Sequence, residues 1–471
     1  MQFSKKPRPE ILSSLSNLKL TPFWLDNPKR PEPTPTLTES INTELLIVGG
    51  GFTGLWTALL AKENNPNAEV VIIEAGEIAF GASGRSGGFV SSSLTHSFNN
   101  GVSRWPDEME TIVKLGHENL NEIEETIKRY NIKCDYIRSG ELKVTSKPHE
   151  VDLILDEFKE SNKSGELVKL YDKEKIKTIV NSPTFLAGIF NSACGLVNPA
   201  MLAWGLKKVC IELGVRIFEK TQAIAVENEG EWVLVKTQYG QIKSKKVALA
   251  TNAFPSLIKK LNYYIAPVYD YVLVSEPLTK EQRELINWHR RQGVVDVSNQ
   301  YHYYHYTIDG RILFGGYDAI YHWNNGMGPQ FESRSKSFAL LAEHFFQIFP
   351  QLAGLKFSHA WGGAIDTCTR FTSFWGNEFN GKLVYVLGYT GLGIGASRFG
   401  AKVMLDLLDK KNNERTNLKM IQTKPMPFPP EPLRSLTINL TRWSLQSADD
   451  NYGKRNLWLK ILDFFGLGFN S

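Results

Sequence analysis

Three glycines carry the clearest chemical signal in this chain: Gly49, Gly51 and Gly54 follow directly on the apolar run of residues 45–48. Each glycine suits one part of a phosphate-binding turn. Gly49 makes the tight turn, Gly51 lets the backbone approach a pyrophosphate, and Gly54 lets the next helix pack closely on the strand. The helix predicted from residue 53 directs its positive N-terminus at the phosphates. The pattern predicts an adenine-dinucleotide site.

A carboxylate stands where such a site needs one. The apolar run 70–73 predicts a second strand, and Glu74 follows it about 20 residues beyond the glycine turn. A carboxylate there accepts hydrogen bonds from a pair of ribose hydroxyls. Because the glycines lie between a strand and a helix, with an acid at this spacing, the signal is far more specific than glycines alone.

Three further segments favour a flavin over a nicotinamide cofactor. A glycine-rich loop at 81–88 carries Arg85, a strand ends at 250–252, and a strand, glycine loop and helix fill 383–408. One sheet visited three times, with glycine loops at its strand ends, suits a long cofactor lying over its carboxyl edge. The helix N-terminus at 391–395 would stabilise negative charge on a reduced flavin.

The least ordinary segment outside these motifs is Tyr-His-Tyr-Tyr-His-Tyr at 301–306. In a strand, Tyr303 and His305 point one way and His302 the other. An aromatic pocket suits an amine. Its π faces can hold the ammonium cation, while desolvation favours the neutral amine, which is the form that can lose hydride. The alternative, that these aromatic side chains fill the core of the sheet, stays open. The candidate catalytic residues are His302, Tyr303, His305 and Trp361.

Composition narrows the class of protein. A chain of 471 residues, 42% hydrophobic and 22% charged, indicates a globular protein with two domains. A net charge of +5 without a dense basic run argues against nucleic acid. Four cysteines without metal-like spacing indicate free thiols of a cytoplasmic protein, and no metal site is expected. We expect no secretory signal, because no apolar segment follows the basic residues of the N-terminus. We expect no transmembrane segment, because the glycine turn interrupts the uncharged stretch 45–61.

Periodicity predicts the elements that position these residues. Amphipathic helices are expected at 107–130 and 148–162, with a strand at 141–145 between them. Asn198 and Pro199 begin a helix that Gly214 ends. Further predicted strands lie at 215–218, 222–228, 231–237, 242–250 and 383–387, and between 263 and 318; further helices lie at 333–347 and from 391–395 to 408. The predicted division is an N-terminal arm (1–39), a discontinuous cofactor domain (40–100, 195–260 and 355–412), a substrate domain (101–194 and 261–354) and a C-terminal extension (413–471).

Taken together, the motifs resemble the D-amino-acid-oxidase-like flavoproteins, most nearly their gamma-glutamylputrescine-oxidase-like members. The matching segments are 23–26 (FWLD), 49–61 (GGGFTGLWTALLA), 81–88 (GASGRSGG), 250–255 (ATNAFP), 307–316 (TIDGRILFGG), 361–366 (WGGAID), 388–395 (GYTGLGIG), 427–434 (PFPPEPLR) and 466–471 (GLGFNS). The resemblance spans nearly the whole chain. It implies an α/β fold, with a glutathione-reductase-type Rossmann domain for FAD and a second domain built on a mostly antiparallel sheet.

The resemblance also implies an activity, oxidation of a C–N bond, and a set of cofactor contacts. Ala223 would contact the adenine, and two departures are notable: Leu392 and His305 replace a histidine and an arginine common in the family. The second change leaves substrate identity open. The predicted cofactor residues are Gly49, Gly51, Phe52, Thr53, Gly54, Glu74, Ala75, Ala82, Ser83, Gly84, Arg85, Ser86, Gly87, Gly88, Ala223, Thr251, Asn252, Gly388, Gly391, Leu392, Gly393 and Ile394.

The expected protein is an FAD enzyme that oxidises a primary or secondary amine, such as an amino acid or a polyamine derivative, by hydride transfer to flavin N5, after which the imine hydrolyses. Oxygen or an electron carrier would reoxidise the flavin. We expect FAD to bind non-covalently, since Cys368 is not where the family attaches flavin. Two alternatives remain: a flavin monooxygenase using NAD(P)H, although a Gly-Asp pair typical of that class is absent at 388–390, and a non-catalytic FAD-stabilised protein. The amine, the electron acceptor, the oligomeric state and any contact of the aromatic segment 458–469 with a membrane or another subunit stay open.

Overall fold

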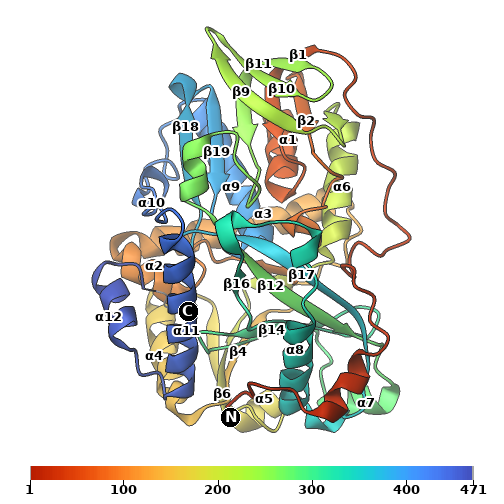
Figure 1. The fold of residues 1–471 in the computed structure, drawn as a ribbon, viewed down its shortest axis with the longest axis vertical. Coiled ribbons are helices and arrows are strands. Elements are labelled where there is room, and N and C mark those ends of the chain that lie inside the picture. The colour runs from red at the N-terminus through yellow and green to blue at the C-terminus, as the bar shows by residue number, and fades with distance from the viewer. Residues whose placement is uncertain (1, 469–471) are drawn as a thin grey trace.

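The chain forms two large β-sheets, which lie one above the other along the long axis of the molecule (Figure 1). The structure is a computed structural model that describes residues 2–468. The first sheet lies in the upper half of Figure 1 with helices α1, α6 and α9, and the second lies in the lower half with helix α8.

The first sheet is the predicted dinucleotide-binding sheet. Its strands are β1 (Ile41–Val48), β2 (Val70–Ile73), β8 (Arg216–Phe218), β9 (Ala223–Glu229), β10 (Trp232–Thr237), β11 (Gln241–Leu249), β18 (Phe374–Glu378) and β19 (Leu383–Leu387). The order β19–β11–β1–β2–β8 is parallel throughout, with β18 antiparallel at one edge. The antiparallel hairpin β9–β10 joins the N-terminal half of β11.

The alternation of β1 explains why this sheet is covered on both sides. Leu45 and Ile47 pack into the core formed with the helices, whereas Leu46 and Val48 pack against residues of β10 and β11. All four side chains are buried. A strand buried on both faces is a continuous apolar run, which is how the parallel strands of such sheets are recognised in a sequence.

The second sheet is mostly antiparallel. Its strands are β4 (Glu141–Thr145), β5 (Val168–Asp172), β6 (Ala187–Asn191), β12 (Ala266–Ser275), β13 (Gly293–Asp296), β14 (His302–Tyr306), β15 (Ile312–Gly316), β16 (Ile320–Tyr321) and β17 (Phe357–Thr367). Its order is β16–β12–β15–β14–β13–β4–β6–β5, with β17 also on β12. Among the described strands of this second sheet, only β13 and β4 pair in parallel. A separate pair, β3 (Phe89–Ser91) with β7 (Cys194–Leu196), lies outside both sheets.

Strand β17 pairs outside the first sheet. We expected residues 355–412 in the cofactor domain, but β17 pairs with β12 along nearly its whole length. Residues 357–367 therefore belong to the second sheet. The physical reason is that a strand's partner is set by tertiary pairing, whereas the prediction placed these residues with the strand that follows them in the chain.

Helices pack on both sheets. They are α1 (Phe52–Asn64), α2 (Phe98–Arg104), α3 (Met109–Arg129), α4 (Val151–Lys163), α5 (Lys173–Lys177), α6 (Pro199–Glu212), α7 (Lys280–Ile286), α8 (Ser335–Ile348), α9 (Gly393–Leu408), α10 (Lys419–Gln422), α11 (Leu433–Asp450) and α12 (Leu457–Phe464). Helix α1 packs against α6 and α9, and α8 packs on β12 and β15 of the second sheet. The other face of the second sheet is left for the cavity described below.

The N-terminal arm runs along one edge of the molecule from the second sheet to the first (Figure 1). It is more integrated than the predicted surface arm, because Trp24, Leu25 and Leu37 are buried. The Trp24 indole N–H donates to the carbonyl of Ser86, 2.9 Å away. The arm thereby supports the glycine-rich loop 81–88.

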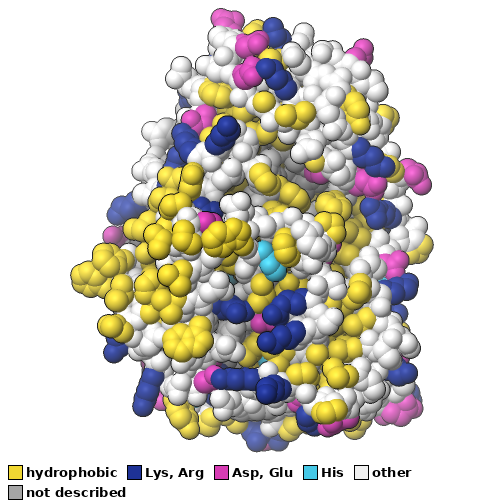
Figure 2. All heavy atoms as spheres, in the orientation of Figure 1, with side chains coloured by type: hydrophobic (Ala, Val, Ile, Leu, Met, Phe, Trp, Pro, Cys, Tyr) yellow, Lys and Arg dark blue, Asp and Glu magenta, His cyan; other side chains and the backbone are white. Residues whose placement is uncertain are grey.

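The C-terminal extension contains helix α11, which the sequence analysis did not predict, and α12, which packs on α11 through Trp458 and buried Leu459. Figure 2 shows hydrophobic side chains gathered over this part of the surface, where Trp443 and Phe464 are exposed. Phe469 and the last residues of the 466–471 motif lie outside the described residues. Among the helices described, none combines the length and apolar character needed to cross a membrane.

Candidate cofactor and substrate site

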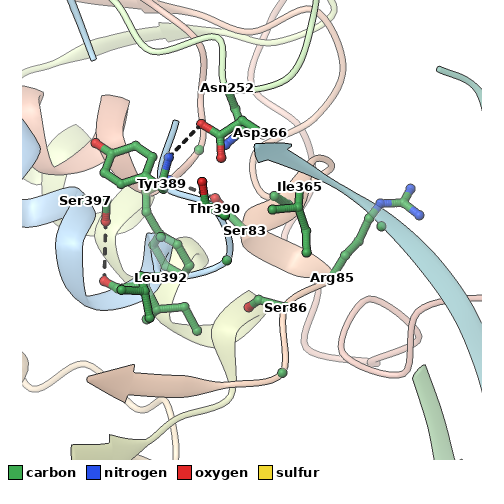
Figure 3. Close-up of a pocket in the computed structure, with 18 of the residues that line it drawn as sticks. Ser83, Arg85, Ser86, Asn252, Ile365, Asp366, Tyr389, Thr390, Leu392 and Ser397 are labelled. Atoms are coloured by element: carbon green, nitrogen blue, oxygen red, sulfur yellow. Dashed lines mark hydrogen bonds between the residues drawn. The ribbon is translucent and has the colours of Figure 1, made fainter. Parts of the chain in front are cut away.

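One cavity of about 790 Å³ extends from the carboxyl ends of β1 and β2 across one face of the second sheet. Figure 3 shows part of its wall. Both sheets contribute to its wall. Its size lies in the range of small-molecule sites, and its position at the carboxyl edge of a parallel sheet is where such folds bind ligands.

The glycine turn after β1 has the geometry that its sequence predicts. Gly49 has φ +114°, and a Cβ there would lie 2.4 Å from the carbonyl oxygen of Ala250. A Cβ on Gly54 would lie 1.9 Å from the carbonyl oxygen of Gly49, so Gly54 lets α1 pack against the turn. A Cβ on Gly51 would lie 2.9 Å from Oγ of Ser83 at the cavity wall. These positions exclude larger residues for steric reasons.

Glu74 lines the cavity just beyond β2, as expected. Its two carboxylate oxygens accept the backbone N–H groups of Gly50 (2.7 Å) and Gly76 (2.8 Å). Burial raises the pKa of Glu74, and these two hydrogen bonds oppose the shift. A carboxylate offers about four acceptor positions, so two remain for ribose hydroxyls.

The loop at 81–88 and the segment 250–252 each present a polar atom that has no partner among the described residues. The Oγ of Ser86 and the Oγ1 of Thr251 are buried and make no hydrogen bond, and both residues line the cavity. Buried hydroxyls without partners are costly. A polar cofactor in the cavity would satisfy them, so the donor set fits the predicted FAD.

The strand–turn–helix unit at 383–408 closes the opposite wall. Asp366, at the end of β17, accepts the N–H groups of Gly388 (2.7 Å) and Tyr389 (3.2 Å). Burial raises the pKa of Asp366 to about 6. A Cβ at Gly391 or Gly393 would meet no atom within 4 Å, so this backbone faces open space at the start of α9. Figure 3 shows the turn with Asp366 beside it.

Most predicted cofactor residues reach the cavity wall. Those that line it are Gly49, Gly51, Phe52, Thr53, Glu74, Ala75, Ala82, Ser83, Arg85, Ser86, Gly87, Gly88, Ala223, Thr251, Asn252, Gly391, Leu392, Gly393 and Ile394. Gly54, Gly84 and Gly388 do not line the cavity: a Cβ on each would lie within 3.0 Å of a protein atom. These three glycines serve packing and turn geometry instead of direct contact.

On the substrate side, the structure brings Tyr303 to the cavity with an aspartate that the sequence analysis missed. The Tyr303 hydroxyl donates to Oδ2 of Asp270 at 2.6 Å. Tyr303 reaches β12 across Gly315, where a Cβ would lie 2.6 Å from the ring. The pair therefore depends on a glycine in the intervening strand.

Three candidate catalytic residues do not line the cavity. Trp361 is buried and donates its indole N–H to the carbonyl of Arg85 (2.9 Å). His305 is buried beneath Gly87, with Nε2 2.8 Å from that carbonyl oxygen, and it stacks on Trp24. Both residues support the loop at 81–88 from behind. Their position behind the wall was not predicted, because alternation assigns a side chain to a face but does not show what covers that face.

His302 faces the core of the second sheet, as its place in the alternation implies. Its Nδ1 lies 2.7 Å from Oδ2 of Asp296, and its Nε2 lies 2.9 Å from Nδ1 of His344. His344 Nε2 must donate to the carbonyl of Ser4 (2.7 Å), because a carbonyl only accepts. Burial lowers the pKa of both histidines to about 3 and raises that of Asp296. Because both imidazoles are neutral, the carboxyl group of Asp296 is protonated and donates the hydrogen bond to Nδ1 of His302.

This arrangement predicts that His302→Ala lowers stability without slowing chemistry. The substitution strands buried polar atoms of Asp296 and His344, at a cost of about 2–4 kcal/mol. Thermal unfolding measures the loss, and the exposed His289→Ala serves as control. A slowed reductive reaction at unchanged melting temperature would instead restore His302 as a catalytic residue.

Comparison with known proteins identifies the family. A sequence profile described as FAD dependent oxidoreductase, of the D-amino-acid-oxidase (DAO) type, matches residues 44–407. The chain belongs to this family. The oxidoreductase is 31% identical to gamma-glutamylputrescine oxidoreductase of Escherichia coli (strain K12), over 80% of this chain and 86% of that protein. It is 27% identical to the probable oxidoreductase OrdL of Haemophilus influenzae, over 82% and 87% of the two chains. The predicted family is confirmed.

Solved structures confirm the fold class of the oxidoreductase. L-proline dehydrogenase from P. horikoshii superimposes with a TM-score of 0.66 at 20% identity, covering 81% of this chain and 96% of that one. Glycine oxidase from Geobacillus kaustophilus has the same TM-score at 17% identity, covering 82% and 99%. At these identities the likeness shows the fold alone: a Rossmann-type FAD domain joined to a second domain.

Proposed function

We propose that this FAD-dependent oxidoreductase oxidises a C–N bond of a primary or secondary amine, such as an amino acid or a polyamine derivative, and that the resulting imine hydrolyses. The observation that carries the proposal is one continuous cavity, which joins the dinucleotide edge of the first sheet to an aromatic and acidic face of the second. The names of the E. coli relative and of the two solved structures, which refer to an amine or an amino acid, support this substrate class.

Different segments of the cavity wall would bind different parts of FAD. The turn at 49–54 and the N-terminus of α1 would hold the pyrophosphate, and Glu74 the ribose. The loop at 81–88 and the start of α9 would hold the ring system. FAD bound in this way supplies the hydride acceptor, N5 of its ring.

We further propose that FAD is held without a covalent bond. Cys368 does not line the cavity, and its Sγ lies 3.1 Å from the carbonyl oxygen of Thr372. Burial raises the pKa of the Cys368 thiol, which disfavours the reactive thiolate. Acid precipitation of the purified protein should therefore release all of the flavin into the supernatant. Flavin that stays with the pellet would contradict this prediction.

Anaerobic mixing with a panel of amines tests the proposed activity. Bleaching of the flavin by an amine, without NAD(P)H, supports amine oxidation. Bleaching only by NAD(P)H indicates a flavin monooxygenase, and no reduction by either indicates a non-catalytic role. Repeating the assay in air with and without an artificial electron acceptor tests whether oxygen or a carrier reoxidises the flavin. We also propose that the protein is cytoplasmic and that its chain divides into a cofactor domain and a substrate domain.

A further inference from the structure

Asp270 is a half-buried carboxylate on the cavity wall, and among the described residues no cationic side chain is paired with it. Its oxygens accept hydrogen bonds from the Tyr303 hydroxyl (2.6 Å) and the backbone N–H of Tyr271 (2.7 Å), and the N–H of Gly316 also contributes. None of these partners carries a positive charge. A carboxylate shielded from bulk solvent is normally paired with a cation or protonated, so an unpaired one that faces a ligand cavity calls for an explanation.

Asp270 lies beside the loop predicted to hold the flavin ring. The Tyr303 ring packs against Gly87, where a Cβ would come within 2.5 Å of it. Asp270 pairs in register with Gly363 of β17, and a Cβ on Gly363 would lie 3.4 Å from Cβ of Arg85. The carboxylate is therefore close to residues 85–88 of the loop.

The basic side chains of the cavity wall are already engaged. Arg85 forms an ion pair with Glu332 (2.8 Å), and Lys143 forms one with Glu157 (2.9 Å). In Figure 3 the guanidinium of Arg85 points away from Leu392. The charge of Asp270 is thus left uncompensated, which favours a positively charged ligand at this point and disfavours a carboxylate.

We propose that Asp270 binds the reacting nitrogen of a cationic amine and accepts one of its protons, and that the substrate bears no carboxylate on the carbon that is oxidised. The inference rests on the proposed function and specifies its substrate class. In the proton step, one N–H bond of the ammonium breaks and an O–H bond forms on Asp270. The electron pair of the broken bond stays on nitrogen as the lone pair that assists loss of hydride. Tyr303 positions the carboxylate.

The proposal has a pH dependence. Burial raises the pKa of Asp270 to about 6, while the hydrogen bond from Tyr303 opposes the shift and the charge of Asp318 adds to it. The other titratable groups facing Asp270 are Tyr301, Tyr271 and the Arg85–Glu332 pair. Below about pH 6 the protonated carboxyl can neither attract the cation nor take its proton. We therefore expect kcat/KM to fall as the pH drops through this value.

Anaerobic stopped-flow reduction of the holoenzyme tests the proposal. The probes are butylamine and 1,4-diaminobutane, each compared with its α-carboxylated counterpart, norvaline and ornithine. We expect both amines to be preferred. Asp270→Asn should weaken the apparent amine affinity by about tenfold or more, the value of a charged hydrogen bond, and should remove the acid limb of the profile. Asp309→Asn, which removes an exposed carboxylate, is the charge-matched control.

The outcomes separate the two proposals. If neither the amines nor the amino acids bleach the wild-type flavin, the proposed function fails. If the amino acids are preferred, or if Asp270→Asn keeps both amine affinity and the acid limb, the inference fails and amine or amino-acid oxidation stands. Should Asp270→Asn lose FAD, Tyr303→Phe replaces it: without the hydroxyl the pKa of Asp270 rises, so the acid limb should move to higher pH. An unmoved limb would contradict the inference.

Discussion

Gly51→Val should yield a folded protein that has lost FAD. Gly51 has φ −80° and ψ −174°, an extended conformation that valine adopts readily, so the backbone is not strained. The side chain, however, would enter the space beside Oγ of Ser83, where Cβ alone lies 2.9 Å away. Displacing the pyrophosphate or the loop costs about 3 kcal/mol, which corresponds to a loss of about 100-fold in FAD affinity. Flavin absorbance and titration of apoprotein with FAD measure the effect.

Gly230→Val is the matched control. Gly230 lies in the turn between β9 and β10, away from the cavity, and a Cβ there would meet no atom within 4 Å. Its positive φ of +62° makes this variant less stable without touching the cofactor site. We expect it to bind FAD normally. Equal FAD loss in both variants, or full FAD content in Gly51→Val, would show that the turn does not hold the pyrophosphate.

Glu219→Ala should destabilise the protein more than other single carboxylate substitutions. Glu219 is 1% exposed and accepts hydrogen bonds from Nζ of Lys207 (2.5 Å), the N–H of Ile78 (2.6 Å) and the N–H of Thr34 (2.5 Å). It ties the N-terminal arm and the segment after β2 to α6. Its removal leaves a buried ammonium without a carboxylate, which costs about 3–5 kcal/mol. Urea unfolding at a fixed FAD concentration measures the loss.

Two variants calibrate that result. Glu227→Ala breaks an exposed ion pair with Lys236 and should change stability by less than about 1 kcal/mol. Adding Lys207→Met to Glu219→Ala should recover part of the loss, because the uncompensated charge is gone. If the double variant lost more unfolding free energy than its two single variants lose together, this explanation of the buried pair would be contradicted.

The fold was predictable where one physical signal dominates. The strands at 141–145 and 383–387 have the limits that their apolar patterns predict. Helix α7 was missed within a region predicted as strands, although Thr279 and Gln282 form a capping box. Helix α11 was missed because it lies on the surface, follows a proline-rich segment and buries few side chains, so it lacks a clear apolar period.

The cofactor site was more predictable than the substrate site. Glycines such as Gly49 and Gly51 are dictated by steric limits that act within a few residues, and a sequence displays such limits directly. The pairing of Asp270 with Tyr303 depends on the order of strands β12, β15 and β14 and on the absence of a side chain at Gly315. An acidic residue in a strand ordinarily indicates a solvent-facing side, so Asp270 gave no signal of its own.

The visible absorption spectrum of the purified protein shows whether the proposed flavin site is formed. The proposal is that residues 49–54, 81–88 and 388–394 form one FAD site at the edge of the first sheet. The account predicts the absorption bands of oxidised flavin in stoichiometric amount, after reconstitution with FAD where the cofactor has been lost in purification. A colourless protein that takes up no FAD under these conditions would contradict the account.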